Sequence, residues 1–254
     1  MASRTHSMLD TPVRVQPGVF AALVAQDVAN QFRSWLVRGW LAGSAVIALV
    51  LVVTASGQST EASKVVSGAL ALYVLALSVV VILATASAVS GDGGVLGDAI
   101  LSRAVTRDDY LLAKFSSRLL VVAGVFLGVV VPFVGLVARY APNDLSPAGT
   151  ALGVVTVLAL LLFLSTLGVA LSSVLNSTVL AVATLAVCWY FAGAAFSFLE
   201  LGFLSPERII DELEPVVAGK YELGREMARL GTVYALSVAT VTLAVVGFRR
   251  RDIE

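Results

Sequence analysis

The stretch from residue 151 to residue 199 is almost entirely apolar and contains no Asp, Glu, Lys or Arg. As a single helix it would be roughly 70 Å long, because each helical residue adds about 1.5 Å. That is more than twice the thickness of the bilayer hydrocarbon core, which is about 30 Å. The stretch must therefore fold back, and Asn176-Ser177-Thr178 is its strongest polar break. The sequence predicts two membrane spans joined by a tight turn.

The rest of the chain has the same character. Hydrophobic residues make up 58% of the sequence and charged residues 13%, with a mean hydropathy of +0.94, which is outside the range of soluble domains. A helix needs about 20 apolar residues to cross a bilayer. Six segments meet or approach this length, at about 38–56, 65–89, 115–138, 151–175, 178–199 and 231–248. We expect an all-α integral membrane protein whose six-span domain covers residues 38–254.

The distribution of Lys and Arg predicts the orientation. Six spans place both termini on one side of the membrane, and that side carries eleven of the 17 basic residues: Arg4, Arg14, Arg33, Arg38, Arg103, Arg107, Lys114, Arg118, Arg249, Arg250 and Arg251. The other side carries Lys64, Arg139, Arg208, Lys220, Arg225 and Arg229. Basic residues concentrate on the cytoplasmic side of membrane proteins. We therefore expect a multi-pass protein of the cytoplasmic (inner) membrane with both termini in the cytoplasm.

The N-terminal region divides into two parts. Residues 1–16 are predicted to form a disordered cytoplasmic tail. Residues 17–37 carry apolar side chains at helical spacing, at Phe20, Leu23, Val24, Val28, Phe32 and Leu36, while Gln26, Asp27, Asn30, Gln31 and Arg33 fill much of the remaining surface. This pattern is typical of an amphipathic helix that lies in the membrane interface. A simple inward extension of the first span remains the alternative.

The polar segment between the second and third spans, residues 91–118, has helical patterning of its own. Four glycines at 91, 93, 94 and 97 precede a short apolar stripe formed by Ile100, Leu101, Ala104 and Val105. Thr106 is followed three residues later by Asp109, the spacing of a capping box. The sequence predicts a short helix at about 95–105, a break, and a new helix of about 50 Å from Arg107 to Arg139.

The last connection, residues 200–229, lies on the predicted outer side. Ser205-Pro206-Glu207 is a favourable helix start, with a capping residue, a first-turn proline and an acidic residue. Pro215 and Gly219 are expected to end this helix. A second short helix, around residues 221–229, should lead into the sixth span.

Several kinds of chemistry are excluded or disfavoured. No Walker A string is present, and the glycines at 91–97 do not have dinucleotide-binding spacing. The single histidine, His6, and the single cysteine, Cys188, do not make a metal site. The net charge of zero suggests no nucleic-acid partner. The interiors of the predicted spans lack ionisable groups, which argues against a proton relay or an intramembrane protease. We therefore expect no catalytic, cofactor-binding or metal-binding residue in this chain.

Aromatic residues within the spans are candidates for a substrate path. Tyr73 is in the second span, and Tyr190 and Phe191 are in the fifth, beside the small residues 192–195. One interpretation is the wall of a cavity. The other, which remains open, is ordinary helix packing and aromatic side chains that face lipid.

Three features together resemble one family. The first is the stretch Ser90-Gly91-Asp92 through Leu101-Ser102-Arg103-Ala104-Val105-Thr106-Arg107 to Lys114. The second is the N-terminal amphipathic helix, represented by Phe20, Val24 and Arg33, and the third is the ending Phe248-Arg249-Arg250-Arg251-Asp252. The chain resembles the ABC-2-type membrane (permease) subunits of ATP-binding-cassette transporters. It departs from the family pattern at Ala104, where many relatives have proline, and at Asp92, where Glu is common.

The resemblance implies that residues 95–105 form a coupling helix that contacts a separate ATPase subunit. The contact residues would be Asp98, Ile100, Leu101, Arg103, Ala104, Val105 and Arg107. It also implies two permease subunits, as a homo- or heterodimer, with two ATPase subunits that bind ATP and Mg. The expected activity is alternating access, usually export, and the uncharged spans suit an apolar or amphipathic substrate. The alternative is a non-transporting membrane anchor or assembly factor. The uncharged spans disfavour a secondary transporter or channel.

Overall fold

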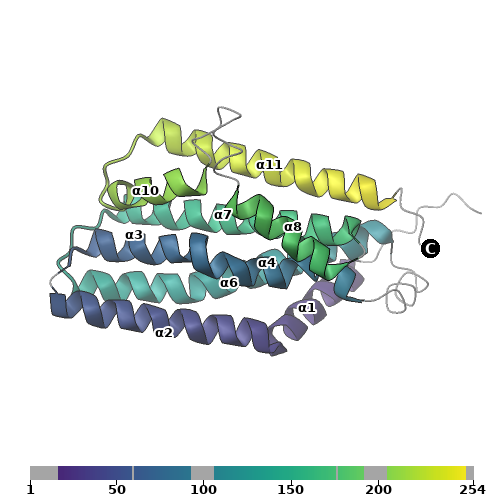
Figure 1. Cartoon of the computed structure of the whole chain (residues 1–254), viewed down its shortest axis with the longest axis horizontal. Coiled ribbons are helices and arrows are strands. Elements are labelled where there is room, and N and C mark those ends of the chain that lie inside the picture. The colour runs from purple at the N-terminus through teal and green to yellow at the C-terminus, as the bar shows by residue number, and fades with distance from the viewer. Residues whose placement is uncertain (1–16, 59, 93–105, 176, 192–204, 250–254) are drawn as a thin grey trace, which may run out of the picture.

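The computed structural model describes residues 17–58, 60–92, 106–175, 177–191 and 205–249. Every regular element in these ranges is a helix: α1 (Pro17–Arg33), α2 (Trp35–Gln58), α3 (Ala62–Leu72), the π-helical turn η1 (Tyr73–Leu77), α4 (Ser78–Ala86), the 3₁₀ turn η2 (Ser90–Asp92), α6 (Arg107–Tyr140), α7 (Pro147–Val174), α8 (Thr178–Tyr190), α10 (Pro206–Val217) and α11 (Leu223–Arg249). The long helices lie side by side in a bundle, and α1 is inclined across one end (Figure 1). The all-helical prediction is confirmed for these residues.

Five helical segments of the described chain are long and apolar enough to cross a membrane. They are Trp35–Gln58, Ala62–Ala86, Arg107–Tyr140, Pro147–Val174 and Leu223–Phe248. This composition indicates a membrane-embedded protein. The remaining predicted span, 178–199, coincides with α8 over 13 residues, and its continuation beyond Phe191 is outside the described residues.

Side-chain caps set the helix boundaries that the sequence predicted. The Thr106 side chain accepts a hydrogen bond from the Asp109 N–H at 3.2 Å, and α6 begins at the next residue, Arg107. The Ser177 hydroxyl accepts from the Leu180 N–H at 3.4 Å, so α7 and α8 are separate helices. Both the new helix at Arg107 and the break around 176–178 are confirmed. In each case a hydroxyl satisfies an N–H group that has no partner within the helix.

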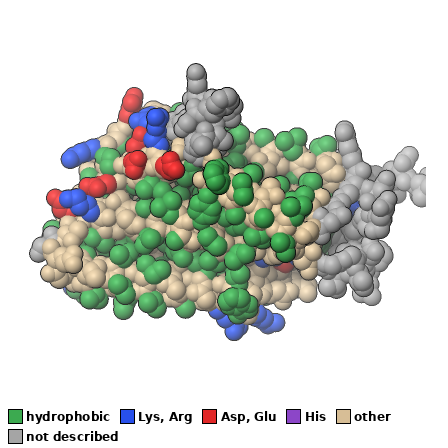
Figure 2. Space-filling model, in the orientation of Figure 1, with side chains coloured by type: hydrophobic (Ala, Val, Ile, Leu, Met, Phe, Trp, Pro, Cys, Tyr) green, Lys and Arg blue, Asp and Glu red, His purple; other side chains and the backbone are tan. Residues whose placement is uncertain are grey.

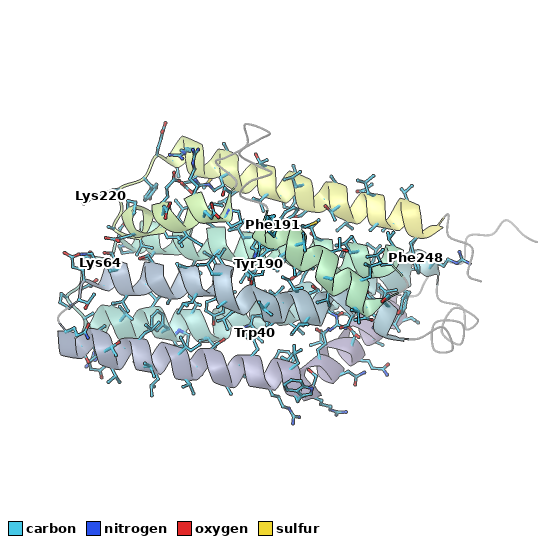
Figure 3. The ribbon with its side chains drawn as sticks, in the orientation of Figure 1. Trp40, Lys64, Tyr190, Phe191, Lys220 and Phe248 are labelled. Atoms are coloured by element: carbon cyan, nitrogen blue, oxygen red, sulfur yellow. The ribbon has the colours of Figure 1, made fainter. Side chains whose placement is uncertain are left out.

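Figure 3 places Lys64 and Lys220 at one end of the bundle and Phe248 at the other; we call these the Lys64 end and the Phe248 end. At the Lys64 end, Asp144 accepts hydrogen bonds from the N–H of Ser63 at 2.8 Å and from its hydroxyl at 2.5 Å. The Asp144 carboxylate therefore provides an acceptor for a free N–H group in the first turn of α3 and lies at the positive end of the helix dipole. The Ser146 N–H donates to the Val217 carbonyl at 3.0 Å, which joins the start of α7 to the end of α10.

The connection before the last helix differs in two ways from the sequence prediction. The helix α10 starts at Pro206 as predicted, but it continues through Pro215 and ends only at Val217. Gly219, with φ +84°, ends it: Lys220 and Gly219 donate to the carbonyls of Pro215 and Val216, the two bonds of a Schellman motif. The predicted separate helix at 221–229 was wrong, because these residues belong to α11, which runs unbroken from Leu223 to Arg249.

The apolar core has two parts. The larger one joins α3, α6 and α7 with neighbouring residues of η1, α4, α8 and α10. A smaller cluster at the Phe248 end joins α6, α7 and α11 through Tyr110, Leu111, Phe115, Val169, Ala244 and Phe248, with Ala88. By contrast, α2 and α11 leave large apolar side chains exposed, such as Leu49 and Leu243. Figure 2 shows hydrophobic side chains over the middle of the bundle, acidic side chains mainly at the Lys64 end, and basic ones both there and on the lower side of the bundle.

Candidate functional site

The contact between α1 and α6 is built around a carboxylate. Asp27 of α1 accepts hydrogen bonds from Lys114 of α6 at 2.9 Å and from the Ser117 hydroxyl at 2.5 Å. Gln31, one turn after Asp27, donates a third at 2.9 Å. The side chains of Lys114 and Asp27 are only 11% and 18% exposed. We call Asp27, Gln31, Lys114 and Ser117 the α1–α6 junction.

The position of Asp27 corrects the sequence analysis, which placed Asp27 and Gln31 on the polar surface of an amphipathic helix. In the structure Asp27 binds Lys114 and Ser117 of α6, and Gln31, which is only 6% exposed, donates to Asp27. Residues at positions i and i+4 share one helix face, so the Gln31 amide reaches the Asp27 carboxylate. A carboxylate is tolerated there because an ammonium and a hydroxyl of α6 donate to it. Periodicity reports which residues share a face, but it does not identify a polar partner on another helix.

Electrostatics keep this carboxylate ionised. Burial raises the pKa of the Asp27 carboxyl, but the hydrogen bond from Ser117 and the charges of Lys114 and Arg118 outweigh burial and hold the pKa below its ordinary value of 3.8. The Lys114 ammonium also lies 5.7 Å from the centre of the Tyr110 ring, within the range of a cation–π contact. The junction therefore combines an ion pair with aromatic packing at the Phe248 end.

A bend at Ser34 separates α1 from α2. The guanidinium of Arg38 donates to the Phe32 carbonyl at 3.1 Å, and the Ser34 hydroxyl accepts from the Val37 N–H at 3.3 Å. The N-terminal helix thus ends at Arg33, before the predicted boundary at residue 37. Of the residues proposed to represent this helix, Phe20 and Val24 are half-buried and Arg33 is exposed.

Most of the predicted ATPase contacts are outside the described residues: Asp98, Ile100, Leu101, Arg103, Ala104 and Val105. Arg107 is described, and it is the half-buried first residue of α6. The chain on either side of the segment is anchored. Ser172 accepts from the N–H groups of Val89 and Ser90 at 2.9 and 3.0 Å, and Thr106 caps α6. The segment 93–105 is therefore bracketed by the end of the second span and the start of α6.

The three predicted substrate-path residues do not share one surface. Tyr73 is buried, with its ring 4.9 Å from that of Phe126 in an edge-on arrangement. Tyr190 and Phe191 are exposed at the end of α8 (Figure 3). The Tyr190 hydroxyl donates to the Leu75 carbonyl at 2.7 Å, so its polar group is used in packing.

The π-helical turn η1, within the second span, is a feature that the sequence analysis missed. Widening a helix to i→i+5 hydrogen bonds disturbs the regular pairing of its carbonyls, and such turns are frequent at functional sites. Two aromatic residues of α8 donate to carbonyls of this turn: Trp189 to Val74 at 3.2 Å and Tyr190 to Leu75 at 2.7 Å. The adjacent Trp-Tyr pair was the only available signal, because residues 73–77 themselves read as an ordinary apolar helix.

A second charge cluster lies where α10 meets α11, and its residues were also missed. The Arg229 side chain is almost fully buried and donates to both oxygens of Glu226 at 2.9 Å and to Glu212. Arg225 pairs with Glu212 at 2.5 Å. Burial raises the pKa of Glu212, but the hydrogen bond and charge of Arg229, with the charge of Arg225, hold it below its ordinary value of 4.5. The sequence signal for this cluster was Glu226 followed three residues later by Arg229, in the helix that includes the last span.

Within the described ranges, no group of three His, Cys, Asp or Glu residues could hold a metal ion. The α1–α6 junction and the α10–α11 charge cluster are polar contacts between helices. A comparison with models of known protein families found no match to this chain, and a comparison with curated proteins also found none.

Proposed function

We propose that this chain is the transmembrane subunit of an ATP-binding-cassette transporter of the ABC-2 type. In this proposal six spans, the fifth of them covering 178–199, lie in the cytoplasmic membrane with both termini in the cytoplasm. Two such subunits, identical or different, work with two ATPase subunits that hold ATP and Mg. The subunit exports an apolar or amphipathic molecule by alternating access and performs no catalysis itself.

The observation that carries the proposal is the continuity of α6. This helix runs for 34 residues from Arg107, next to the proposed coupling segment 95–105, to Tyr140 at the Lys64 end. Such a helix is roughly 50 Å long. A displacement of residues 95–105 by an ATPase would pass across the break at Thr106 to the start of α6, and α6 would carry it to the far side of the membrane.

The α1–α6 junction extends this mechanical link. Lys114 and Ser117 hold Asp27, and Arg38 bridges the bend between α1 and α2. Movement of α6 would therefore carry α1, and through it the start of α2. Rigid-body motion of packed helices is a common way to couple two sites. We propose that α1, α2 and α6 move as one unit during transport.

The test uses the tagged full-length chain purified from its native membrane. Quantitative mass spectrometry of the wild type should find an ATPase with Walker motifs at a one-to-one ratio with the chain. The double variant Leu101→Ala/Arg103→Ala should lose this subunit, or lose ATP-driven transport, while still inserting. A matched control, Arg208→Ala/Leu223→Ala, replaces the same residue types at exposed positions of α10 and α11 and should retain both.

Two outcomes would contradict the proposal. Unchanged co-purification and transport in the Leu101→Ala/Arg103→Ala variant would remove the coupling assignment. Stable insertion of the wild type with no ATPase at stoichiometric ratio would favour the membrane anchor or assembly factor instead.

A further inference from the structure

The bend between α1 and α2 carries an exposed tryptophan between two exposed arginines. Trp35, the first residue of α2, is 83% exposed, more than any other large hydrophobic side chain of the described chain. Arg33 ends α1, and Arg38 lies three residues after Trp35, on the same face of α2. Both arginines are exposed. We call Arg33, Trp35 and Arg38 the bend surface.

The positive charge of the bend surface is not balanced by nearby acidic residues. No Asp or Glu occurs between Asp27 and Glu61, and the Asp27 carboxylate is already bound to α6. Within the described ranges, no carboxylate forms an ion pair with Arg33 or Arg38. Figure 2 shows basic side chains on the lower side of the bundle, where α1 meets α2 in Figure 1. The charge of these two guanidinium groups is therefore available to an anion.

The bend holds one of the two guanidinium groups in place. The Arg38 Nε donates to the Phe32 carbonyl at 3.1 Å. An arginine has five N–H donors, so this bond leaves the four on its two terminal nitrogens. Such N–H groups can bind two oxygens of one phosphate. Arg38 therefore loses little conformational freedom when it binds an anion.

The length of α2 places the bend surface at the edge of the membrane. The helix has 24 residues and is roughly 36 Å long, slightly more than the hydrocarbon core of about 30 Å. Its first turn therefore lies at the boundary with the lipid headgroups. Tryptophan favours this boundary because its ring is apolar and its N–H group is polar. The headgroup region thus suits an exposed Trp35 better than water does.

Beyond the bend, α2 offers an apolar strip to the lipid chains. Val46, Leu49 and Val53 are 62%, 63% and 62% exposed. They lie about three, four and five helical turns after Trp35, so they share its side of the helix. A lipid whose headgroup meets the two arginines can therefore place an acyl chain along α2.

We propose that the bend surface binds the phosphate headgroup of an anionic phospholipid of the bilayer. Arg33 and Arg38 contact the phosphate, the Trp35 ring lies at the level of the glycerol, and an acyl chain follows the apolar strip of α2. A zwitterionic lipid fits less well, because its cationic group meets two arginines. This binding needs neither an ATPase nor transport, so it does not depend on the function proposed above.

The test measures quenching of Trp35 fluorescence by brominated lipids, with the full-length chain in nanodiscs. One set of nanodiscs contains brominated phosphatidylglycerol in unbrominated phosphatidylcholine, and the other set has the bromines on phosphatidylcholine. Trp40 and Trp189 are only 3% and 6% exposed, so contact quenching should report Trp35, and Trp35→Phe should remove it. We expect phosphatidylglycerol to be preferred by about 30-fold, that is, about 5-fold for each arginine.

Variants without the charges test the two arginines. Arg33→Gln/Arg38→Gln should lose the preference, and Arg33→Gln alone, which keeps the bond from Arg38 to the bend, should reduce it about 5-fold. The matched control, Arg139→Gln/Arg208→Gln, removes the same charge at exposed positions of α6 and α10 and should keep the full preference. Inorganic phosphate, compared with chloride at equal ionic strength, should not reduce the preference, because it has no acyl chain to bind along α2.

Several results would overturn the proposal. Equal quenching by both lipids would show that Trp35 faces lipid but that the arginines do not select a headgroup. No quenching by either lipid would show that protein, such as a second copy of the chain, covers the bend. Competition by inorganic phosphate would indicate a site for a soluble anion. A full preference in Arg33→Gln would assign the selection to other charges. If the double variant does not fold, Arg33→Gln and the two lipids on the wild-type chain still decide the question.

Discussion

The Lys114 ammonium lies 2.9 Å from a carboxylate oxygen of Asp27, 87 positions earlier in the sequence, and this pair fastens α1 to α6. The Ser117 hydroxyl shares the same carboxylate. The contact joins α1, the proposed interfacial helix, to α6, which begins next to the proposed coupling segment. Its strength is therefore the first property of the protein to measure.

Replacing Lys114 by Met should destabilise the protein by about 1–3 kcal/mol, because the partly buried Asp27 carboxylate loses its ammonium partner. Adding Asp27→Asn should restore part of the loss, since the unpaired charge is then removed. SDS-induced unfolding in mixed micelles measures both. Lys64→Met is the control: its ion pair with Glu61 is about half exposed and screened by solvent, so its loss should change the stability little. A Lys114→Met loss no larger than this control would contradict the structural role of the junction.

The charge cluster of Glu212, Arg225 and Arg229 predicts a loss of stability in acid. The folded-state pKa of Glu212 is below 4.5, so on acidification the unfolded chain takes up a proton before the folded chain does. The contribution is therefore fully present above pH 4.5 and is lost as the pH falls through the lower folded-state pKa. Thermal unfolding between pH 6 and pH 3 should show a steeper decline for the wild type than for Glu212→Gln. Parallel curves would show that the cluster does not stabilise the fold.

Gly168 of α7 is predicted to be intolerant of alanine. A Cβ at this position would lie 2.1 Å from the Thr85 hydroxyl oxygen and 2.7 Å from the Thr85 Cβ, a side chain of α4. Such overlap forces two packed helices apart and should cost about 1–3 kcal/mol. Gly128→Ala on α6 meets nothing within 4 Å and should be neutral or stabilising by up to about 1 kcal/mol. The ratio of folded to aggregated protein after heating compares the two variants; equal behaviour would contradict the close α4–α7 contact.

Trp189 should stabilise the π-helical turn through its N–H group. Trp189→Phe keeps an aromatic ring but leaves the Val74 carbonyl without its 3.2 Å donor, so we expect a loss of about 1–2 kcal/mol. Trp35→Phe, at a side chain that is 83% exposed, should change the unfolding free energy by less than about 0.5 kcal/mol. Amide hydrogen exchange at residues 73–78 provides a local measurement and should speed up only in Trp189→Phe. Faster exchange in both variants would indicate a general effect of losing an indole.

Much of the helical framework could be predicted because it depends on local chemistry. A hydroxyl at Thr106 or Ser177 caps the N–H groups that follow it, whatever the rest of the chain does. Long apolar runs must be helices because a bilayer offers no partner for unpaired backbone groups. Of the two wrong boundaries, the end of α10 is still local, because a Schellman motif at Gly219 ends the helix after Val217. At the start of α11, Arg229 pairs with Glu212 of the preceding helix, a contact that the local sequence does not specify.

The sequence by itself determined an all-helical, apolar chain, the break around residues 176–178 and the start of α6 at Arg107. Only the tertiary structure decided that Asp27 meets Lys114, that Trp189 binds the carbonyl of Val74, and that Arg229 pairs with Glu212. The physical reason is the range of the interactions. Caps and apolar runs act over a few residues, whereas these contacts join side chains on different helices. The periodicity of apolar residues along one helix does not specify which helix lies opposite.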